Sequence, residues 1–246
     1  MTEDGLLGAM HEAATAVRHA LDGLEDWGLA GRRPGQHHSD LAADEAALAV
    51  LERAGVGVLS EESGLHHPDR AVLVALDPVD GSTNAARRLP WFATSMCALD
   101  DHGPLAAVVV NQATGERYEA ERGGGARLDG RELVPSRCST LGTSVLGLSG
   151  WPGRHLGWRQ MRSLGAIALD LCAVAAGRLD GYVDCSHDAH GPWDYLGGLL
   201  VCLEAGAVVT DARGRDLVAR AHEDRRSPVA AGTPELLSQL LAARAA

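Results

Sequence analysis

The 246-residue chain lacks several features that mark whole classes of protein. Its first residues, Met1 to Gly5, have neither the basic segment nor the apolar segment of a secretory signal peptide. No later apolar run approaches the length of a membrane span. We therefore expect a cytoplasmic protein with no membrane partner.

Cysteines are few and are not arranged in motifs. The five cysteines are an odd number, are widely separated, and form no C-x-x-C pair. This usage is typical of thiols in a reducing compartment and argues against a disulfide framework.

Basic residues are also outnumbered in this chain. The 22 Lys and Arg residues stand against 33 Asp and Glu, which gives a formal net charge of -11, and no tract is rich in basic and aromatic residues. Nucleic-acid binding depends on basic side chains that neutralise phosphates, so we expect no nucleic-acid partner. An acidic protein can still bind a phosphate ester if bound cations reverse the local field.

What the chain contains is the composition of an ordinary folded protein, with 46% apolar and 22% charged residues. Apolar side chains repeat first with a helical period and then in short strand-like runs. A glycine-rich stretch at 122–127 lacks the G-x-G-x-x-G spacing of a nucleotide loop, and we interpret it as a hairpin turn. The first half is thus expected to contain helices at 6–27 and 42–53 and strands at 56–59, 71–76, 93–99, 105–111 and 116–120.

Beyond Pro135 the pattern changes to an alternation of strands and helices, which favours an α/β arrangement. We expect one domain over residues 1–246, with an α+β half at about 1–135 and an α/β half at about 136–246. The predicted elements of the second half are strands at 144–148, 181–184 and 207–210 and helices at 159–177, 195–205 and 234–245.

The segment D-P-V-D-G-S at 77–82 follows a strand predicted to be buried. Pro78 fixes the backbone in a turn that can bring Asp77 and Asp80 toward one point, where they would repel unless a cation lay between them. Hard oxygen ligands of this kind select Mg²⁺ or Mn²⁺. The alternative is a simple turn, because Asp, Pro, Gly and Ser are all favoured turn residues.

Carboxylates at other predicted element ends favour the cation site over the simple turn. Glu61 and Glu62 follow the strand at 56–59, and Asp194 precedes the apolar part of a helix. Alone, the two glutamates could be a solvated loop pair and Asp194 an N-cap. Their joint occurrence with Asp77 and Asp80 predicts a metal site.

Three segments, in this order, carry a resemblance to a known family: Glu61-Glu62-Ser63-Gly64, the stretch D-P-V-D-G-S-T-N at 77–84, and Trp193-Asp194. They resemble the inositol monophosphatase family, within the superfamily of lithium-sensitive phosphatases that includes fructose-1,6-bisphosphatase. The resemblance covers most of the chain, from the first helix to Asp211. It implies a layered αβαβα sandwich, magnesium-dependent hydrolysis of a phosphate monoester, and a homodimer.

The resemblance also implies a set of metal ligands. Glu61, Asp77 and the carbonyl of Val79 would hold one Mg²⁺, and Asp77, Asp80 and Asp194 would hold a second. Two or three Mg²⁺ ions are expected in each active site, with Mn²⁺ as a substitute. The implied reaction is an in-line displacement by a metal-activated water, with the second ion stabilising the leaving alkoxide.

Further roles follow from the same resemblance. Ser82 and an aspartate of the second helix match the pair that orients the attacking water; Asp40 and Asp44 both qualify, and the register favours Asp44. Asp184 matches an acid that contacts substrate hydroxyls. The predicted catalytic residues are Asp44, Ser82, Glu61 and Asp77, and the predicted substrate contacts are Asp80, Gly81, Ser82, Thr83, Gly165, Ala166, Asp184 and Asp194.

Three points stay open in the sequence. Gly165 and Ala166 could serve only close packing. The segment 185–192 is longer than its usual counterpart, so substrate choice could differ, and His187 and His190 within it are candidate substrate contacts. A zinc site is disfavoured, because the histidines have no cysteine partner and no H-E-x-x-H helix.

The leading hypothesis is hydrolysis of an inositol monophosphate or a related cyclitol or sugar phosphate. One alternative keeps the chemistry but acts on histidinol phosphate, fructose-1,6-bisphosphate or a 3'-phosphonucleotide. A second alternative, from a different functional class, is a regulatory binding protein that retains the fold.

Overall fold

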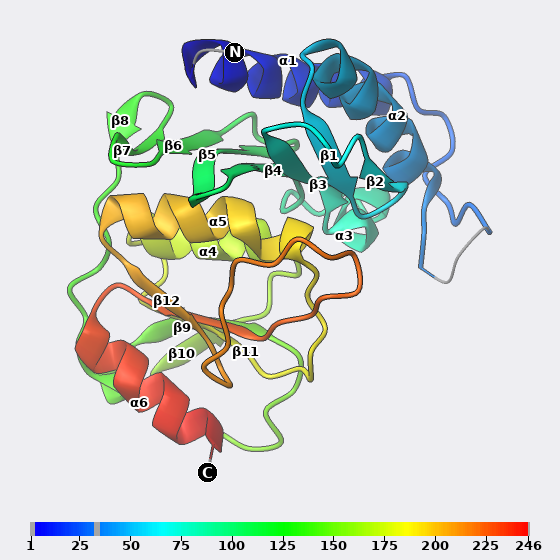
Figure 1. The fold of residues 1–246 in the computed structure, drawn as a ribbon. Coiled ribbons are helices and arrows are strands. Elements are labelled where there is room, and N and C mark those ends of the chain that lie inside the picture. Colours follow the sequence, from blue (N-terminus) through cyan, green and yellow to red (C-terminus); the bar gives the residue numbers. More distant parts are fainter. Residues whose placement is uncertain (1–2, 32–34, 246) are drawn as a thin grey trace.

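The computed structural model, which describes residues 3–31 and 35–245, is built in five layers (Figure 1). Helices α1 (Glu3–Asp22) and α2 (His38–Arg53) cover one face of an eight-stranded sheet. Helices α4 (Ile167–Ala175) and α5 (Pro192–Ala205) lie between this sheet and a five-stranded sheet. Helix α6 (Pro234–Ala245) covers the far face of the smaller sheet. The predicted αβαβα sandwich is confirmed.

The eight-stranded sheet has the strand order β2-β1-β3-β4-β5-β6-β7-β8. Only β1 and β3 pair in parallel, and every other neighbouring pair is antiparallel. The glycine-rich stretch forms the turn between β6 and β7, as predicted. The bounds are β1 Gly57–Ser60, β2 Gly64–His66, β3 Leu73–Asp80, β4 Ala93–Asp100, β5 Gly103–Asn111, β6 Arg117–Glu121, β7 Gly125–Leu128 and β8 Arg131–Glu132.

The five-stranded sheet has the order β10-β9-β11-β13-β12, with β9 parallel to both of its neighbours. All of its strands follow β8 in the chain, so each sheet belongs to one half of the sequence. The assignment of residues 1–246 to one domain stays a prediction. The bounds are β9 Val145–Ser149, β10 Gln160–Arg162, β11 Gly181–Asp184, β12 Val208–Asp211 and β13 Pro228–Ala231, with a 3-10 helix at Leu141–Thr143 and a short helix α3 at Ser82–Ala86.

The helix predicted at 159–177 is wrong in its first half. Residues 160–162 form the edge strand β10, and α4 begins only at Ile167. Gly165 has a φ of +84°, which a right-handed helix does not allow, so the helix cannot extend backwards through it. The first helix ends at Asp22 rather than at residue 27, α2 begins at His38 rather than at 42, and strand β13 was not predicted.

Helices α4 and α5 form the apolar centre of the molecule. Every residue of α4 is buried, which is expected of a helix enclosed between two sheets. Two glycines of α5 allow close packing: a Cβ at Gly198 would lie 2.6 Å from the Cβ of Leu171, and one at Gly197 would lie 2.7 Å from the hydroxyl of Ser95. The close packing of α5 against α4 and against β4 fixes where the first residues of both helices lie.

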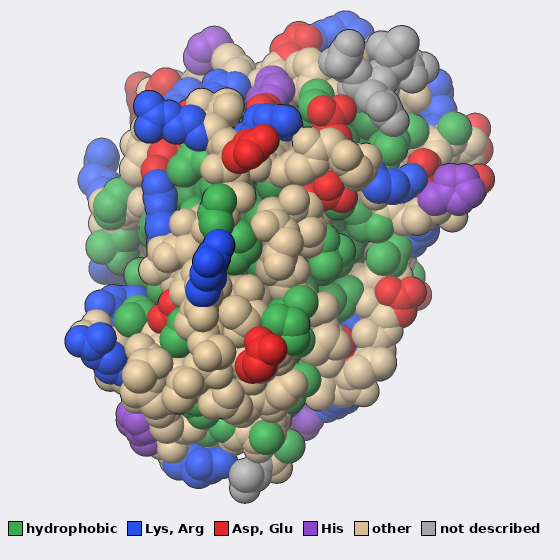
Figure 2. All heavy atoms as spheres, turned by 90° about the vertical axis from the view of Figure 1, so that its left-hand side faces the viewer, with side chains coloured by type: hydrophobic (Ala, Val, Ile, Leu, Met, Phe, Trp, Pro, Cys, Tyr) green, Lys and Arg blue, Asp and Glu red, His purple; other side chains and the backbone are tan. Residues whose placement is uncertain are grey.

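The outer surface carries charges of both signs. Figure 2 shows the molecule from the side of β7 and β8, where basic and acidic side chains are interspersed. Among residues 3–31 and 35–245, no helix combines the length and the apolar character needed to cross a membrane. Helix α3 and the first residues of α5 lie on the opposite side of the molecule (Figure 1).

The loop between β12 and β13 is anchored by Asp211, whose side chain is buried. Its carboxylate accepts hydrogen bonds from the backbone N–H groups of Ser227 (2.9 Å) and Arg213 (3.0 Å) and from the guanidinium of Arg215 (2.8 Å). Burial raises the pKa of Asp211, but the bonds from Arg215 and the backbone outweigh it and hold this pKa below the usual range. The ionised carboxylate therefore stabilises the fold.

We expect the Asp211→Asn variant to lose about 2 kcal/mol of unfolding free energy at pH 7, because an amide cannot accept all of these bonds. The folded pKa is lowered, so this contribution is complete above the unfolded pKa of 3.8 and declines as the pH falls below it. Urea unfolding at pH 7 and at pH 3 measures both effects. The exposed Asp216→Asn variant is the control, and an equal loss in both variants would contradict the prediction.

Candidate functional site

The site begins where the parallel pairing of β1 and β3 ends. Ser60 of β1 pairs with Leu76 of β3, and the N–H of Glu61 donates to the carbonyl of Leu76 at 3.1 Å. The next residues, Glu61 and Asp77, therefore lie at the same edge of the sheet. This is the position where parallel sheets commonly hold a ligand.

The backbone after Asp77 remains extended through Asp80, with a shift in its pairing to β4 between these two residues. The N–H of Val79 donates to the carboxylate of Asp77 at 3.0 Å, and the Thr94 hydroxyl donates to the carbonyl of Pro78 at 2.9 Å. The turn that Pro78 was expected to impose is thus an irregular strand rather than a free loop.

Gly81 ends this strand in a conformation that other residues rarely adopt. Its φ is +86°, and a Cβ here would lie 3.0 Å from the carbonyl oxygen of Gly165 and 3.1 Å from the Cβ of Ala166. The side-chain amide of Asn84 donates to the carbonyls of Trp91 and Leu164, both at 2.7 Å. These contacts hold the start of α3 against the residues that precede α4.

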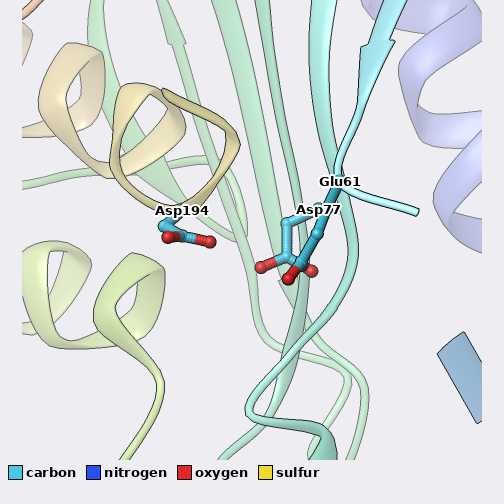
Figure 3. Close-up of side chains that lie close together, drawn as sticks. All are labelled: Glu61, Asp77 and Asp194. Atoms are coloured by element: carbon cyan, nitrogen blue, oxygen red, sulfur yellow. The ribbon is translucent and has the colours of Figure 1, made fainter. Parts of the chain in front are cut away.

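The third acid of the site comes from the other half of the chain. Asp194 lies in the first turn of α5, where its carboxylate accepts the N–H of Gly191 at 2.7 Å. Oxygens of Glu61, Asp77 and Asp194 lie within 4.8 Å of one another, and Figure 3 shows the side chains facing a common point. Of the four acids predicted as metal ligands, these three converge directly.

Asp80 lies beside this group and connects it to α4. Its carboxylate accepts the N–H of Ala168 at 2.7 Å, and its side chain is buried. Asp80 and Asp194 both line a cavity of about 190 Å³, which we call the second cavity to distinguish it from the cleft lined by Glu61 and Asp77. Asp80 thus lies at the border between the acid cluster and this second cavity.

The electrostatics of the cluster are unfavourable without a counter-ion. Burial, followed by the charges of Glu61 and Asp80, raises the pKa of Asp77 well above its usual value. Burial and the charge of Asp194 do the same for the pKa values of Glu61 and Asp80. Carboxylates this close cannot all ionise in a poorly solvated site unless a cation binds between them.

The donor set fits a hard divalent cation. Carboxylate oxygens on one side of a cleft, without sulfur ligands, are what Mg²⁺ and Mn²⁺ prefer. The cleft has a volume of about 290 Å³, which leaves space for water and a phosphate beside an ion. It is lined by Gly35, Gln36, Asp40, Glu61, Glu62, Asp77, Val79 and Ser82.

The structure separates the two candidate aspartates of α2. Asp40 lines the cleft together with Ser82, and its carboxylate accepts the N–H of His37 at 2.8 Å. Asp44 is not among the lining residues, and its carboxylate accepts the hydroxyl of Ser60 instead. The geometry therefore favours Asp40 over the residue that the register favoured.

Of the residues predicted to contact substrate, some line the second cavity and others do not. Gly165 and Ala166 line the second cavity with Asp80 and Asp194. Thr83 is exposed and lines neither of these cavities. Asp184 is fully buried, and its carboxylate accepts the backbone N–H of Ser186 at 2.8 Å, so it lies behind the cavity wall.

Several residues that sequence reasoning did not assign also line the second cavity, among them Asp170 and Tyr182. Asp170 accepts the indole N–H of Trp91 at 2.9 Å, and burial, only partly offset by this bond, raises its pKa to about 7. Tyr182 has a hydroxyl that is buried. Asp170 lies one helical turn after Ala166, which was predicted to contact substrate, and this spacing places both on the same face of the helix. The spacing could be used only once the start of α4 was known.

Comparison with known proteins gives a consistent result. The sequence profile of the inositol monophosphatase family matches residues 36–246. An inositol-1-monophosphatase from Mesorhizobium japonicum is 35% identical over 243 residues, which covers 87% of this chain and 88% of that protein. A fructose-1,6-bisphosphatase from Pyrococcus furiosus is 32% identical over 207 residues, covering 82% of this chain and 80% of that protein. The solved structure of the extragenic suppressor protein suhB from Bartonella henselae has a TM-score of 0.82 at 27% identity and covers 98% of this chain and 99% of that chain.

The acid cluster predicts a specific response to Mg²⁺. We expect the ion to raise the melting temperature, with a gain of about 2.7 kcal/mol when its concentration is 100 times the dissociation constant. The Asp77→Asn variant should lose this gain and should be as stable as the wild type, or more stable, in EDTA, because one of the repelling carboxylates is gone. Differential scanning calorimetry measures both, with Asp216→Asn as the control. A full Mg²⁺ response in Asp77→Asn would refute the site.

Proposed function

Because this chain belongs to the inositol monophosphatase family and is one of its phosphatases, we propose that it hydrolyses the phosphate monoester of a small polyol such as inositol. The observation that carries the proposal is the convergence of Glu61, Asp77 and Asp194 beside a polar cavity. Mg²⁺ held by these acids, by Asp80 and by the carbonyl of Val79 would supply an activated water and positive charge at the reacting phosphate.

In this proposal Asp40 and Ser82 orient the attacking water. Both line the same cleft as Glu61 and Asp77, and the backbone N–H of His37 holds the Asp40 carboxylate in place. Burial raises the pKa of Asp40 to about 6, which suits a group that accepts a proton near neutral pH. Asp44, bonded to Ser60, is assigned a structural role instead.

The alcohol part of the substrate is assigned to the second cavity. Its volume of about 190 Å³ is below the roughly 300–1,000 Å³ of sites for drug-sized ligands, which favours a single-ring alcohol over a nucleoside. Its lining includes the side chains of Asp80, Asp170 and Tyr182, which can bond to hydroxyl groups. A small polyol phosphate is therefore preferred to a 3'-phosphonucleotide.

The proposal is tested by phosphate release from a panel of esters. Inositol-1-phosphate should be hydrolysed faster than a 3'-phosphonucleotide, with release that requires Mg²⁺, falls in the presence of Li⁺ and is lost in Asp77→Asn. Fructose-1,6-bisphosphate and histidinol phosphate belong in the same panel, since they share the chemistry. Release that is indifferent to Mg²⁺ would overturn the mechanism, and no release from any ester would favour the regulatory alternative.

The choice between the two aspartates of α2 has its own test. Asp40→Asn should lower kcat by about 10²–10⁴-fold, the usual contribution of a general base, while Mg²⁺ still raises the melting temperature. Asp44→Asn should keep kcat within a few-fold and cost about 1 kcal/mol of stability through its weakened bond to Ser60. The reverse ranking of the two kcat values would return the role to Asp44.

The homodimer and the cytoplasmic location stay predictions.

A further inference from the structure

A histidine in the segment 185–192 lies between two carboxylates. Nε2 of His190 is 3.6 Å from an oxygen of Asp184, and Nδ1 is 3.5 Å from an oxygen of Asp194. Asp184 ends β11, and Asp194 lies in the first turn of α5. The imidazole thus connects the end of a central strand to one of the three converging acids.

The burial of these groups gives the arrangement its significance. The side chain of Asp184 is 0% exposed and that of His190 is 16% exposed. One oxygen of Asp184 and the Nε2 atom of His190 are buried and have no hydrogen-bond partner among the described residues. A buried polar atom without a partner is unfavourable, so two such atoms that face each other are an arrangement that requires an explanation.

The two contacts of the imidazole are slightly longer than hydrogen bonds, and a small shift of the ring or of either carboxylate would close one of them. The same oxygen of Asp194 that faces Nδ1 also accepts the N–H of Gly191 at 2.7 Å. The Asp194 carboxylate therefore has a backbone contact on one side and the imidazole on another. Groups placed in this way fix the direction in which a carboxylate points.

We infer that His190, supported from behind by Asp184, positions the carboxylate of Asp194 to bind a divalent cation. This inference rests on the proposed function. Groups that orient metal ligands commonly change metal affinity by about 10–100-fold when they are removed. The inference also gives Asp184 a different task from the predicted one, since a fully buried carboxylate behind His190 supports the site and does not touch substrate.

The experiment measures metal binding directly, with Mn²⁺ as the probe and electron paramagnetic resonance as the readout of free ion. The wild type should bind more than one Mn²⁺ ion. The His190→Ala variant should lose about 10-fold or more in Mn²⁺ affinity at the site to which Asp194 contributes. Asp184→Asn should weaken the same site to a smaller extent.

A double-variant cycle tests the coupling between the two residues. If Asp184 acts through His190, adding Asp184→Asn to His190→Ala should cause little further loss of Mn²⁺ affinity. The control is His187→Ala, which removes an exposed histidine of the same segment that contacts Arg213 and should leave Mn²⁺ binding unchanged. If His190→Ala does not fold by circular dichroism, His190→Gln and Asp184→Asn carry the same test.

The outcomes separate this inference from the proposed function. If the wild type binds no Mn²⁺, both fail. If the wild type binds Mn²⁺ and the His190 and Asp184 variants bind it equally well, the positioning role is overturned while the proposed function stands. Additive losses from the two substitutions would also overturn the inference, because the residues would then act independently.

Discussion

The mutual repulsion of buried carboxylates is the constraint on which the rest of the site depends. Glu61, Asp77 and Asp194 are held close together by the backbone elements that carry them, and Asp80 borders the group. An apolar core would stabilise the same fold without this electrostatic cost. The arrangement is favourable only when a cation offsets the charge, so the electrostatic cost of the cluster is also what suits it to bind a cation.

The layered fold explains how acids from both halves of the chain reach one place. The parallel pair β1 and β3 brings two of them to a sheet edge, and the packing of α5 against that sheet brings the third. The first turns of α4 and α5 both face the acids: an N–H of α4 bonds to Asp80, and Asp194 bonds back to the N–H that precedes α5. The partial positive charge of a helix N-terminus offsets some of the negative charge there.

The sequence predicted the principal acids because each is a local signal, whereas the layered sandwich was expected from the family resemblance. A carboxylate at the end of a predicted strand or helix is visible within one segment, and the structure brings Glu61, Asp77 and Asp194 together with Asp80 beside them. The choice between the two aspartates of α2, in contrast, could be made only from the three-dimensional structure. The register along α2 favoured Asp44, but which turn of that helix faces the cleft depends on how α2 packs, and it is Asp40 that lines it.

The role inferred for His190 was hidden for a similar reason. The two carboxylates beside its ring belong to Asp184, six residues before it, and Asp194, four residues after it. Only the path of the segment between β11 and α5 brings both to the ring. The helix predicted at 159–177 failed because the apolar residues of α4 were extended backwards past a glycine whose φ of +84° ends any helix. Periodicity does not reveal a backbone angle.

The origin of the three acids has a consequence for biosynthesis. Glu61 and Asp77 belong to the first sheet, which lies wholly in the N-terminal half, whereas Asp194 enters with α5 long after that sheet has been translated. A nascent chain with only the first sheet carries Glu61 and Asp77 but lacks the third converging carboxylate, so its acid cluster is incomplete. The acid cluster is therefore complete only after translation has passed α5, so a truncated molecule that ends before α5 keeps the first sheet and loses the third carboxylate.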